Sequence, residues 1–199
     1  MIGTRYSEAV RLAVFAHDGQ VRKGTDIPYA AHPIAVSALA LQFGADEDQA
    51  IIAVCHDMVE DCGGHWAQTL RNTFGDRVAD GVLGCSDSAK DGKPKMAWRQ
   101  RKEAYIAHLA TASYDVLLVS LCDKLQNAGC IVADLETIGN YVFTKFVGGK
   151  DGTLWYYESL LAEFMRRKEL PHRAKMDFQA MVHRMMALSA PTESYRAIN

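Results

Sequence analysis

Apolar residues recur at helical spacing along most of the chain, and this periodicity constrains the fold more than any other feature. Residues 5–18 show the i, i+3, i+4, i+7 pattern of one helix face, carried by Ala9, Leu12, Ala13 and Ala16. No stretch shows the alternation of strands and turns that a sheet requires. The sequence therefore predicts an all-α fold of about eight to ten helices.

Start and stop signals divide the rest of the chain into further helices. Pro33 suits the first turn of a helix that Gly44 ends, and Asp46 with Gln49 approximates a capping box. Gly75 separates two shorter helices. The helices predicted after Gly44 cover residues 47–61, 64–74, 76–86, 97–112, 114–137, 153–168 and 172–189, with a polar loop at 86–95 and a glycine-rich loop at 145–153.

Composition limits the classes of protein to consider. A length of 199 residues favours one domain over residues 1–199, and a net charge of −2 gives no basic excess for nucleic-acid binding. No apolar run approaches the roughly 18 residues of a membrane span, and the N-terminus lacks the pattern of a signal peptide. Five cysteines without a CxxC pair favour free thiols in a reducing compartment. We expect a cytoplasmic globular protein of undetermined oligomeric state.

The segment HDMVED, residues 56–61, crowds ionisable groups together. On one continuous helix His56 would lie over Glu60, and Asp57 over Asp61. A solvated acidic face is one interpretation. The preceding run AIIAVC favours burial instead, where carboxylates are costly unless a cation or hydrogen bonds compensate.

Two more residues outside this segment suit a metal site. His32 directly precedes Pro33, and taken alone it reads as a capping or partly buried histidine. Asp123 lies inside an apolar helix, where aspartate is rare without a partner. Lys124 is a candidate partner, although neighbours on a helix point about 100° apart. A mixed set of imidazoles and carboxylates suits Mn²⁺ and would also accept Fe²⁺ or Zn²⁺; this set is His32, His56, Asp57 and Asp123.

These residues, in this order on a helical background, resemble the HD phosphohydrolase superfamily. Five segments over residues 5–165 narrow the resemblance to the alarmone-hydrolase domain of the RelA/SpoT family, ahead of C-terminal helices that reach residue 190. The segments are FAHDGQVRKGTDIPYAAHPIAV, HDMVED, WRQRKEAY, DKLQNA and GGKDGTLWYYESL. The chain is similar to the single-domain small alarmone hydrolases, which implies one compact HD-superfamily helical domain.

The resemblance also implies an activity and a site. The activity is Mn²⁺-dependent hydrolysis of the 3′-pyrophosphate of ppGpp or pppGpp, which yields GDP or GTP and pyrophosphate. The implied metal ligands are His32, His56, Asp57 and Asp123, and the catalytic pair is Glu60 and Asp61. The implied substrate contacts are Arg22, Lys23, Tyr29, Asn127 and Tyr156.

Other interpretations remain open at the level of sequence. In one alternative, Glu60 only orients His56 through a hydrogen bond. In another, Tyr29 and Tyr156 pack in the core. In a third, Arg22 and Lys23 are solvated surface charges. The basic residues of WRQRKEAY either add positive potential at the pocket mouth or only solvate a helix. Rival functions are the same chemistry on adenine alarmones (pppApp or ppApp) or on the 2′-phosphate of NADPH, another HD-type nucleotidase, and a catalytically silent alarmone-binding module.

Overall fold

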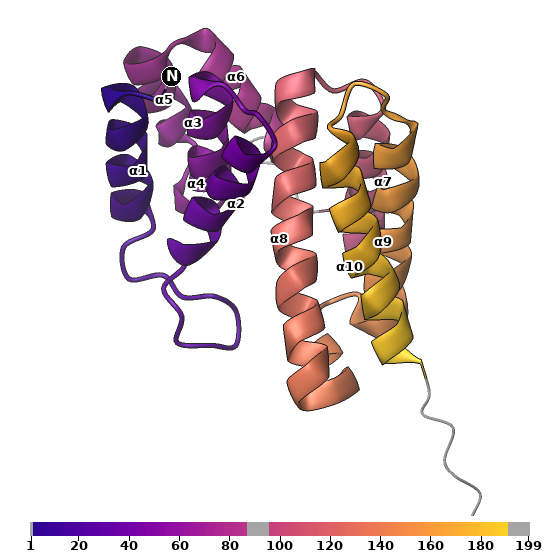
Figure 1. Ribbon diagram of the computed structural model, residues 1–199. Helices are drawn as coiled ribbons and strands as arrows, with labels where there is room; N and C mark the ends of the chain where they lie inside the picture. Colours follow the sequence, from indigo (N-terminus) through magenta and orange to yellow (C-terminus); the bar gives the residue numbers. More distant parts are fainter. Residues whose placement is uncertain (1, 87–95, 191–199) are drawn as a thin grey trace, which may run out of the picture.

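One long helix, α8 (Tyr114–Ile138), lies between two groups of helices and forms the axis of the molecule (Figure 1). The computed structural model describes residues 2–86 and 96–190. On one side α8 packs against α2 (Ala31–Gln42), α3 (Glu47–Cys55) and α6 (Asp76–Cys85). On the other side it packs against α10 (His172–Ser189).

The remaining helices complete the two groups. α1 (Thr4–Ala16), α4 (Met58–Cys62) and α5 (His65–Phe74) join α2, α3 and α6. α7 (Trp98–Leu109), the 3-10 helix η1 (Gly139–Lys145) and α9 (Gly149–Arg166) join α10. Residues 2–86 and 96–190 contain ten α-helices, one 3-10 helix and no strand, which confirms the all-α prediction. Beyond Ser86, the loop predicted at 86–95 lies outside the described residues.

The core depends on α8 because its apolar residues are buried on both sides. Leu117, Leu118 and Leu121 have no exposed surface, and burying each leucine contributes about 1.5–3 kcal/mol. By length and composition the segment Tyr114–Lys145, whose most apolar 18-residue window has a mean hydropathy of 1.4, is apolar enough to cross a membrane. However, 67% of its most apolar window is buried within the structure, as in the core helix of a bundle.

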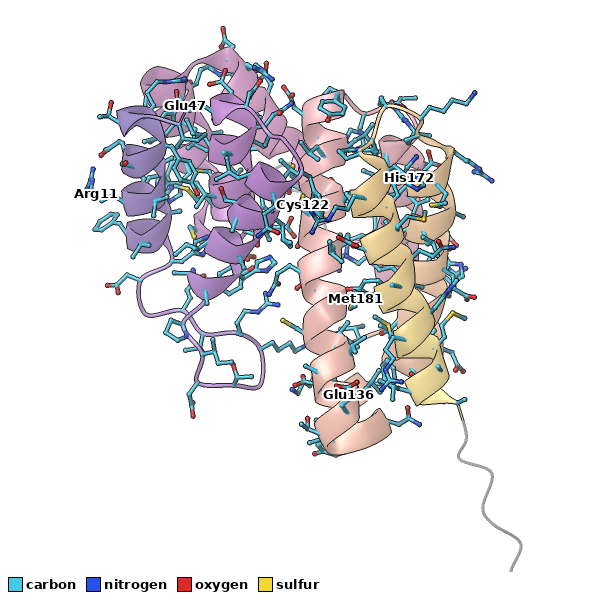
Figure 2. The ribbon with its side chains drawn as sticks, viewed as in Figure 1. Arg11, Glu47, Cys122, Glu136, His172 and Met181 are labelled. Atoms are coloured by element: carbon cyan, nitrogen blue, oxygen red, sulfur yellow. The ribbon has the colours of Figure 1, made fainter. Side chains whose placement is uncertain are left out.

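Two side chains labelled on α8 lie in different environments (Figure 2). Glu136 accepts a hydrogen bond of 2.9 Å from Arg184 of α10 near the lower end of α8. Both of these side chains are about half exposed, so this ion pair contributes little stability. Cys122, in the N-terminal half of α8, is fully buried and belongs to the core.

The predicted helix over residues 47–61 is interrupted, so the expected stacking on one continuous helix is wrong. α3 ends at Cys55, and α4 begins at Met58. The ring Nδ1 of His56 lies 2.8 Å from the carbonyl oxygen of Ala53, which an uninterrupted helix would pair with the amide of Asp57. The predicted capping box at the start of α3 is confirmed, because Asp46 and Gln49 bond reciprocally at 2.9 Å.

The glycine-rich segment at 145–153 is a loop only in part. α9 begins at Gly149, four residues earlier than predicted. Gly148 and Gly152 lie against the indole of Trp98, and a Cβ atom on Gly148 would approach that ring to 2.5 Å. The glycines therefore allow a close helix contact rather than only a flexible turn.

A matched pair of helical glycines tests the packing of α6 against α3. A Cβ atom on Gly81 would overlap the fully buried Ile52, 2.9 Å from its Cγ1, whereas a Cβ atom on Gly129 of α8 meets nothing within 4 Å. We expect Gly81→Ala to lower the free energy of unfolding by about 1–3 kcal/mol. Gly129→Ala should raise it by about 0.5–1 kcal/mol, because alanine is the better helix former.

Urea denaturation of the two variants and the wild type measures both changes. Equal shifts of the same sign in the two variants would contradict the packing argument.

Candidate active site

Two histidines and two aspartates from distant parts of the chain meet in the seam between α8 and the N-terminal group of helices. His32 lies in the first turn of α2, and His56 and Asp57 occupy the break between α3 and α4. Asp123 comes from the middle of α8. His32 and His56 are each 3% exposed and Asp123 is 7% exposed, so the cluster is withdrawn from solvent.

The spacing of these side chains fits a single divalent cation. One ligand atom each from His32, His56 and Asp57 lies within 4.8 Å of the others. Nε2 of His32 is 3.4 Å from Oδ2 of Asp57 and 3.1 Å from Oδ1 of Asp123. Nε2 of His56 is 3.1 Å and 3.7 Å from the same two oxygens. Ligands at about 2.1 Å from a metal lie roughly 3.0–3.4 Å apart in octahedral or tetrahedral geometry.

The orientation of the imidazole rings also suits a metal. Nδ1 of His56 faces the Ala53 carbonyl at 2.8 Å, and Nδ1 of His32 faces Oε1 of Gln126 at 2.6 Å. Both partners are acceptors, so in the neutral ring each Nδ1 carries the proton and each Nε2 turns a lone pair toward the carboxylates. Nε2 of His56 is buried and makes no hydrogen bond of acceptable geometry within the described part of the chain. A divalent cation between these imidazole nitrogens and carboxylate oxygens would give Nε2 of His56 a partner.

Neighbouring donors hold the two carboxylates in place. The Tyr29 hydroxyl donates to Oδ2 of Asp57 at 2.7 Å. Asn127 donates to Oδ1 of Asp123, and the Lys124 ammonium donates to Oδ2, both at 2.6 Å. Lys124 is thus the partner of Asp123, even though the two residues are adjacent on α8.

Opposite charges also shift the pKa values of the cluster in the metal-free protein. Burial alone would raise the pKa of Asp123, but Lys124 and His32 outweigh it and hold that pKa well below its usual value. The pKa of Asp57 is lowered in the same way, mainly by His56 against the effect of burial. Conversely, burial opposes protonation of His56, but Asp57 and Asp123 raise its pKa well above the usual value.

The two candidate catalytic carboxylates line a cavity of about 310 Å³ beside the cluster. Oε2 of Glu60 accepts a hydrogen bond of 3.0 Å from the Ser86 hydroxyl. Partial desolvation and the nearby charge of Asp57 raise the pKa of Asp61. The start of α4 at Met58 places Glu60 and Asp61 in its first turn, and both line the cavity with Asp57 and Asp123.

A larger cavity of about 790 Å³ shares part of its wall with the smaller one. Every residue predicted as a substrate contact lines it: Arg22, Lys23, Tyr29, Asn127 and Tyr156. Nη2 of Arg22 donates to Oδ1 of Asn127 at 2.7 Å, which connects the wall of the cavity to Asp123 through Asn127. Tyr29 also supports Asp57, so its hydroxyl has a partner within the cluster.

Several residues of the cavity wall were not among the predicted site residues. They are Trp98, Arg101, Lys102, Lys124, Gln126 and Lys145. The motif WRQRKEAY indicated a positive pocket mouth as one option, and the structure places Arg101 and Lys102 on both cavities. Gln126 lies on α8 between Asp123 and Asn127, two predicted site residues one helical turn apart. No local pattern in the sequence indicates that its amide contacts His32, 94 residues away.

The raised histidine pKa values predict a pH dependence of stability for the metal-free protein. Groups that bind protons more tightly when folded stabilise the fold fully below their unfolded pKa of about 6.5. This contribution is lost as pH rises through the raised folded pKa values of His32 and His56. In a chelator, the urea midpoint should therefore fall as the pH rises above about 6.5.

His56→Gln serves as the control, because it removes the group whose pKa is raised furthest. We expect its urea midpoint to depend less on pH than that of the wild type. Parallel pH profiles for the two proteins would contradict the assignment.

Known proteins share both the sequence and the fold of this chain. A guanosine-3′,5′-bis(diphosphate) 3′-pyrophosphohydrolase of Haemophilus influenzae is 31% identical over 118 residues, which cover 56% of this chain and 16% of that protein. The bifunctional (p)ppGpp synthase/hydrolase SpoT of Escherichia coli K12 is 30% identical over 129 residues, or 62% and 17% of the two chains. This chain thus spans about one sixth of the length of these curated relatives.

A solved structure of a metazoan ortholog of SpoT, described as hydrolysing ppGpp, has a TM-score of 0.73 and 22% identity, covering 92% of this chain and 96% of that one. A structure from Listeria monocytogenes EGD-e has a TM-score of 0.65 and 24% identity, covering 76% and 96%. These two likenesses show a shared fold. The sequence profile of the HD domain matches residues 9–154 and includes all four members of the histidine–aspartate cluster. Because this match spans well over half of the chain, the protein belongs to the HD domain family.

Proposed function

We propose that His32, His56, Asp57 and Asp123 bind one divalent metal ion, with Mn²⁺ as the expected ion. The support is the buried cluster, in which Nε2 atoms and carboxylate oxygens converge at distances of 3.1–3.7 Å. Mixed nitrogen and oxygen donors suit Mn²⁺.

The proposed reaction is hydrolysis of the 3′-pyrophosphate of ppGpp or pppGpp. The observation that carries it is a metal-type cluster that opens onto cavities lined by cationic side chains: Arg22, Lys23, Arg101, Lys102, Lys124 and Lys145. A nucleotide with two pyrophosphate groups needs concentrated positive charge beside a metal. The relatives named as guanosine-3′,5′-bis(diphosphate) 3′-pyrophosphohydrolases support the choice of substrate.

The residues of the chain have separable tasks in this reaction. A bound divalent metal would supply an acidified water and polarise a phosphate oxygen. Asp61, whose pKa is raised by burial and by Asp57, is suited to accept the proton of the attacking water. Glu60, which accepts a hydrogen bond from Ser86 in the same cavity, is suited to relay this proton to the departing 3′ oxygen. The bond between the 3′ oxygen and phosphorus breaks as the water oxygen bonds to phosphorus, releasing pyrophosphate.

The wall of the larger cavity would hold the nucleotide. Arg22 lies with its guanidinium carbon 5.7 Å from the centre of the Tyr29 ring, so a planar cation and an aromatic ring line the same wall. Such groups stack on a base, and an ammonium such as Lys23 pairs with phosphate. The same assignment favours a cytoplasmic enzyme that acts on a small nucleotide rather than on nucleic acid.

The first test is product analysis with metal-stripped protein and ppGpp. We expect GDP and pyrophosphate to appear only after Mn²⁺ is added, and we expect Asp57→Ala to abolish turnover while retaining its helical circular dichroism. Anion-exchange chromatography separates the products.

The identity of the product also discriminates between the rival functions. Orthophosphate released from NADPH would replace the alarmone assignment with the rival hydrolase. Tight binding of ppGpp by Mn²⁺-loaded, folded protein without turnover would favour the silent binding module.

A second test separates nucleotide binding from metal binding. Arg22→Ala removes a cation from the wall but touches no proposed ligand directly, so we expect KM for ppGpp to rise about 10- to 100-fold with a much smaller change in Mn²⁺ affinity. Asn127→Ala should raise KM for ppGpp and also weaken the binding of Mn²⁺, because Asn127 donates a hydrogen bond to Asp123.

Arg11→Ala is the matched control, since the Arg11 side chain is exposed on α1 and forms an ion pair with Glu8 one turn earlier. Steady-state kinetics and Mn²⁺ titration measure the three variants. An unchanged KM in Arg22→Ala would contradict the placement of the nucleotide.

A further inference from the structure

The two histidines of the metal cluster are oriented by different kinds of partner. Nδ1 of His56 bonds to the backbone carbonyl of Ala53, which can only accept a hydrogen bond. Nδ1 of His32 bonds instead to the side-chain amide of Gln126 at 2.6 Å, across the seam between α2 and α8. An amide has an accepting end and a donating end. The orientation of Gln126 therefore decides which nitrogen of His32 carries the proton.

A second contact fixes the orientation of this amide. Nε2 of Gln126 donates to the sulfur of Cys130 at 3.2 Å, one helical turn further along α8. The carbonyl end of Gln126 therefore faces His32. With the accepting oxygen against Nδ1, the proton of the neutral ring lies on Nδ1, and Nε2 presents a lone pair to the cluster.

The reversed amide would have the opposite effect. Its donating end would face Nδ1 of His32 and move the ring proton to Nε2. That N–H would then point at Oδ1 of Asp123, 3.1 Å away, and at Oδ2 of Asp57, 3.4 Å away. The carboxylates would be satisfied by the proton, and the nitrogen would be unavailable to a metal.

We infer that Gln126 is a positioning residue whose carbonyl selects the metal-binding tautomer of His32 and fixes the direction of its ring. This inference deepens the proposed function and depends on the metal site proposed there. Partners that orient a metal-binding histidine typically change metal affinity or activity 10- to 100-fold when they are removed. Gln126 acts through His32, so its effect should appear without any nucleotide.

The test measures Mn²⁺ affinity of the full chain, after metal stripping and without nucleotide, from the electron paramagnetic resonance signal of free Mn²⁺. Gln126→Met keeps the length of the side chain but removes the acceptor, and we expect Mn²⁺ to bind at least about tenfold more weakly. Gln126→Glu keeps an acceptor oxygen against Nδ1 and should bind Mn²⁺ at least as tightly as the wild type. Gln68→Met makes the same change at an exposed position of α5, where Gln68 donates to Asn72, and should leave Mn²⁺ affinity unchanged.

Nuclear magnetic resonance separates orientation from packing. In metal-stripped, ¹⁵N-labelled protein at a pH above the raised pKa of His32, where the ring is neutral, long-range ¹⁵N–¹H spectra show which ring nitrogen of His32 is protonated. We expect protonated Nδ1 in the wild type and in Gln126→Glu, and loss of this single state in Gln126→Met. A residue that only packs α8 would alter stability and leave this signature in place.

The outcomes are distinct from those of the activity test. Wild-type Mn²⁺ affinity in folded Gln126→Met, or an equal loss of affinity in Gln126→Glu and Gln126→Met, would overturn the role of Gln126. Absence of Mn²⁺ binding by the wild type would overturn the metal site and this role together. Failure to hydrolyse ppGpp with normal Mn²⁺ binding would reject the substrate alone, and the role of Gln126 would stand on the binding data.

Discussion

The ionised carboxylate of Asp123 in the middle of an apolar core helix is the constraint on which the rest of the site depends. A carboxylate so nearly buried is strongly destabilising unless it is paired and hydrogen-bonded. Lys124 and Asn127 supply two donors at 2.6 Å, and Nε2 of His32 lies at 3.1 Å. Lys124 and Asn127 belong to the same helix as Asp123, but His32 reaches it only while α2 stays packed on α8, so the geometry of the cluster depends on the packing of the core.

The fold was largely predictable from sequence because its signals are local. Apolar spacing and capping residues act within one or two turns, which is why the capping box of Asp46 and Gln49 and the bounds of α8 were found. Local signals did not predict the metal-type cluster. Its prediction came partly from the chemistry of the residues and mainly from resemblance to a family; the cluster is His32, His56, Asp57 and Asp123. Spacing along the chain does not place residues 32 and 123 beside each other; the packing of α2 on α8 does.

The features missed by sequence analysis depend on contacts between distant residues or on a side chain that competes with the backbone. The break between α3 and α4 coincides with a side-chain bond from His56 to the Ala53 carbonyl, in a segment with helical spacing. The early start of α9 reflects the indole of Trp98 against Gly148, which reads locally as a loop glycine. From the sequence alone, Gln126 is a polar residue on a helix without an assigned role. Its contact with His32 forms only when α2 packs against α8.

The hydrogen bonds around the cluster link the cavity wall to the cluster through two routes on one face of α8. Arg22 donates to Asn127, and Asn127 donates to Asp123, so a group in the wall of the larger cavity is two hydrogen bonds from a proposed metal ligand. Gln126 lines the same cavity and contacts His32. A ligand that drew Arg22 or Gln126 away would alter the support of Asp123 or of His32. Occupancy of the cavity and occupancy of the cluster are therefore coupled through named side chains, and by linkage each affects the other to the same extent.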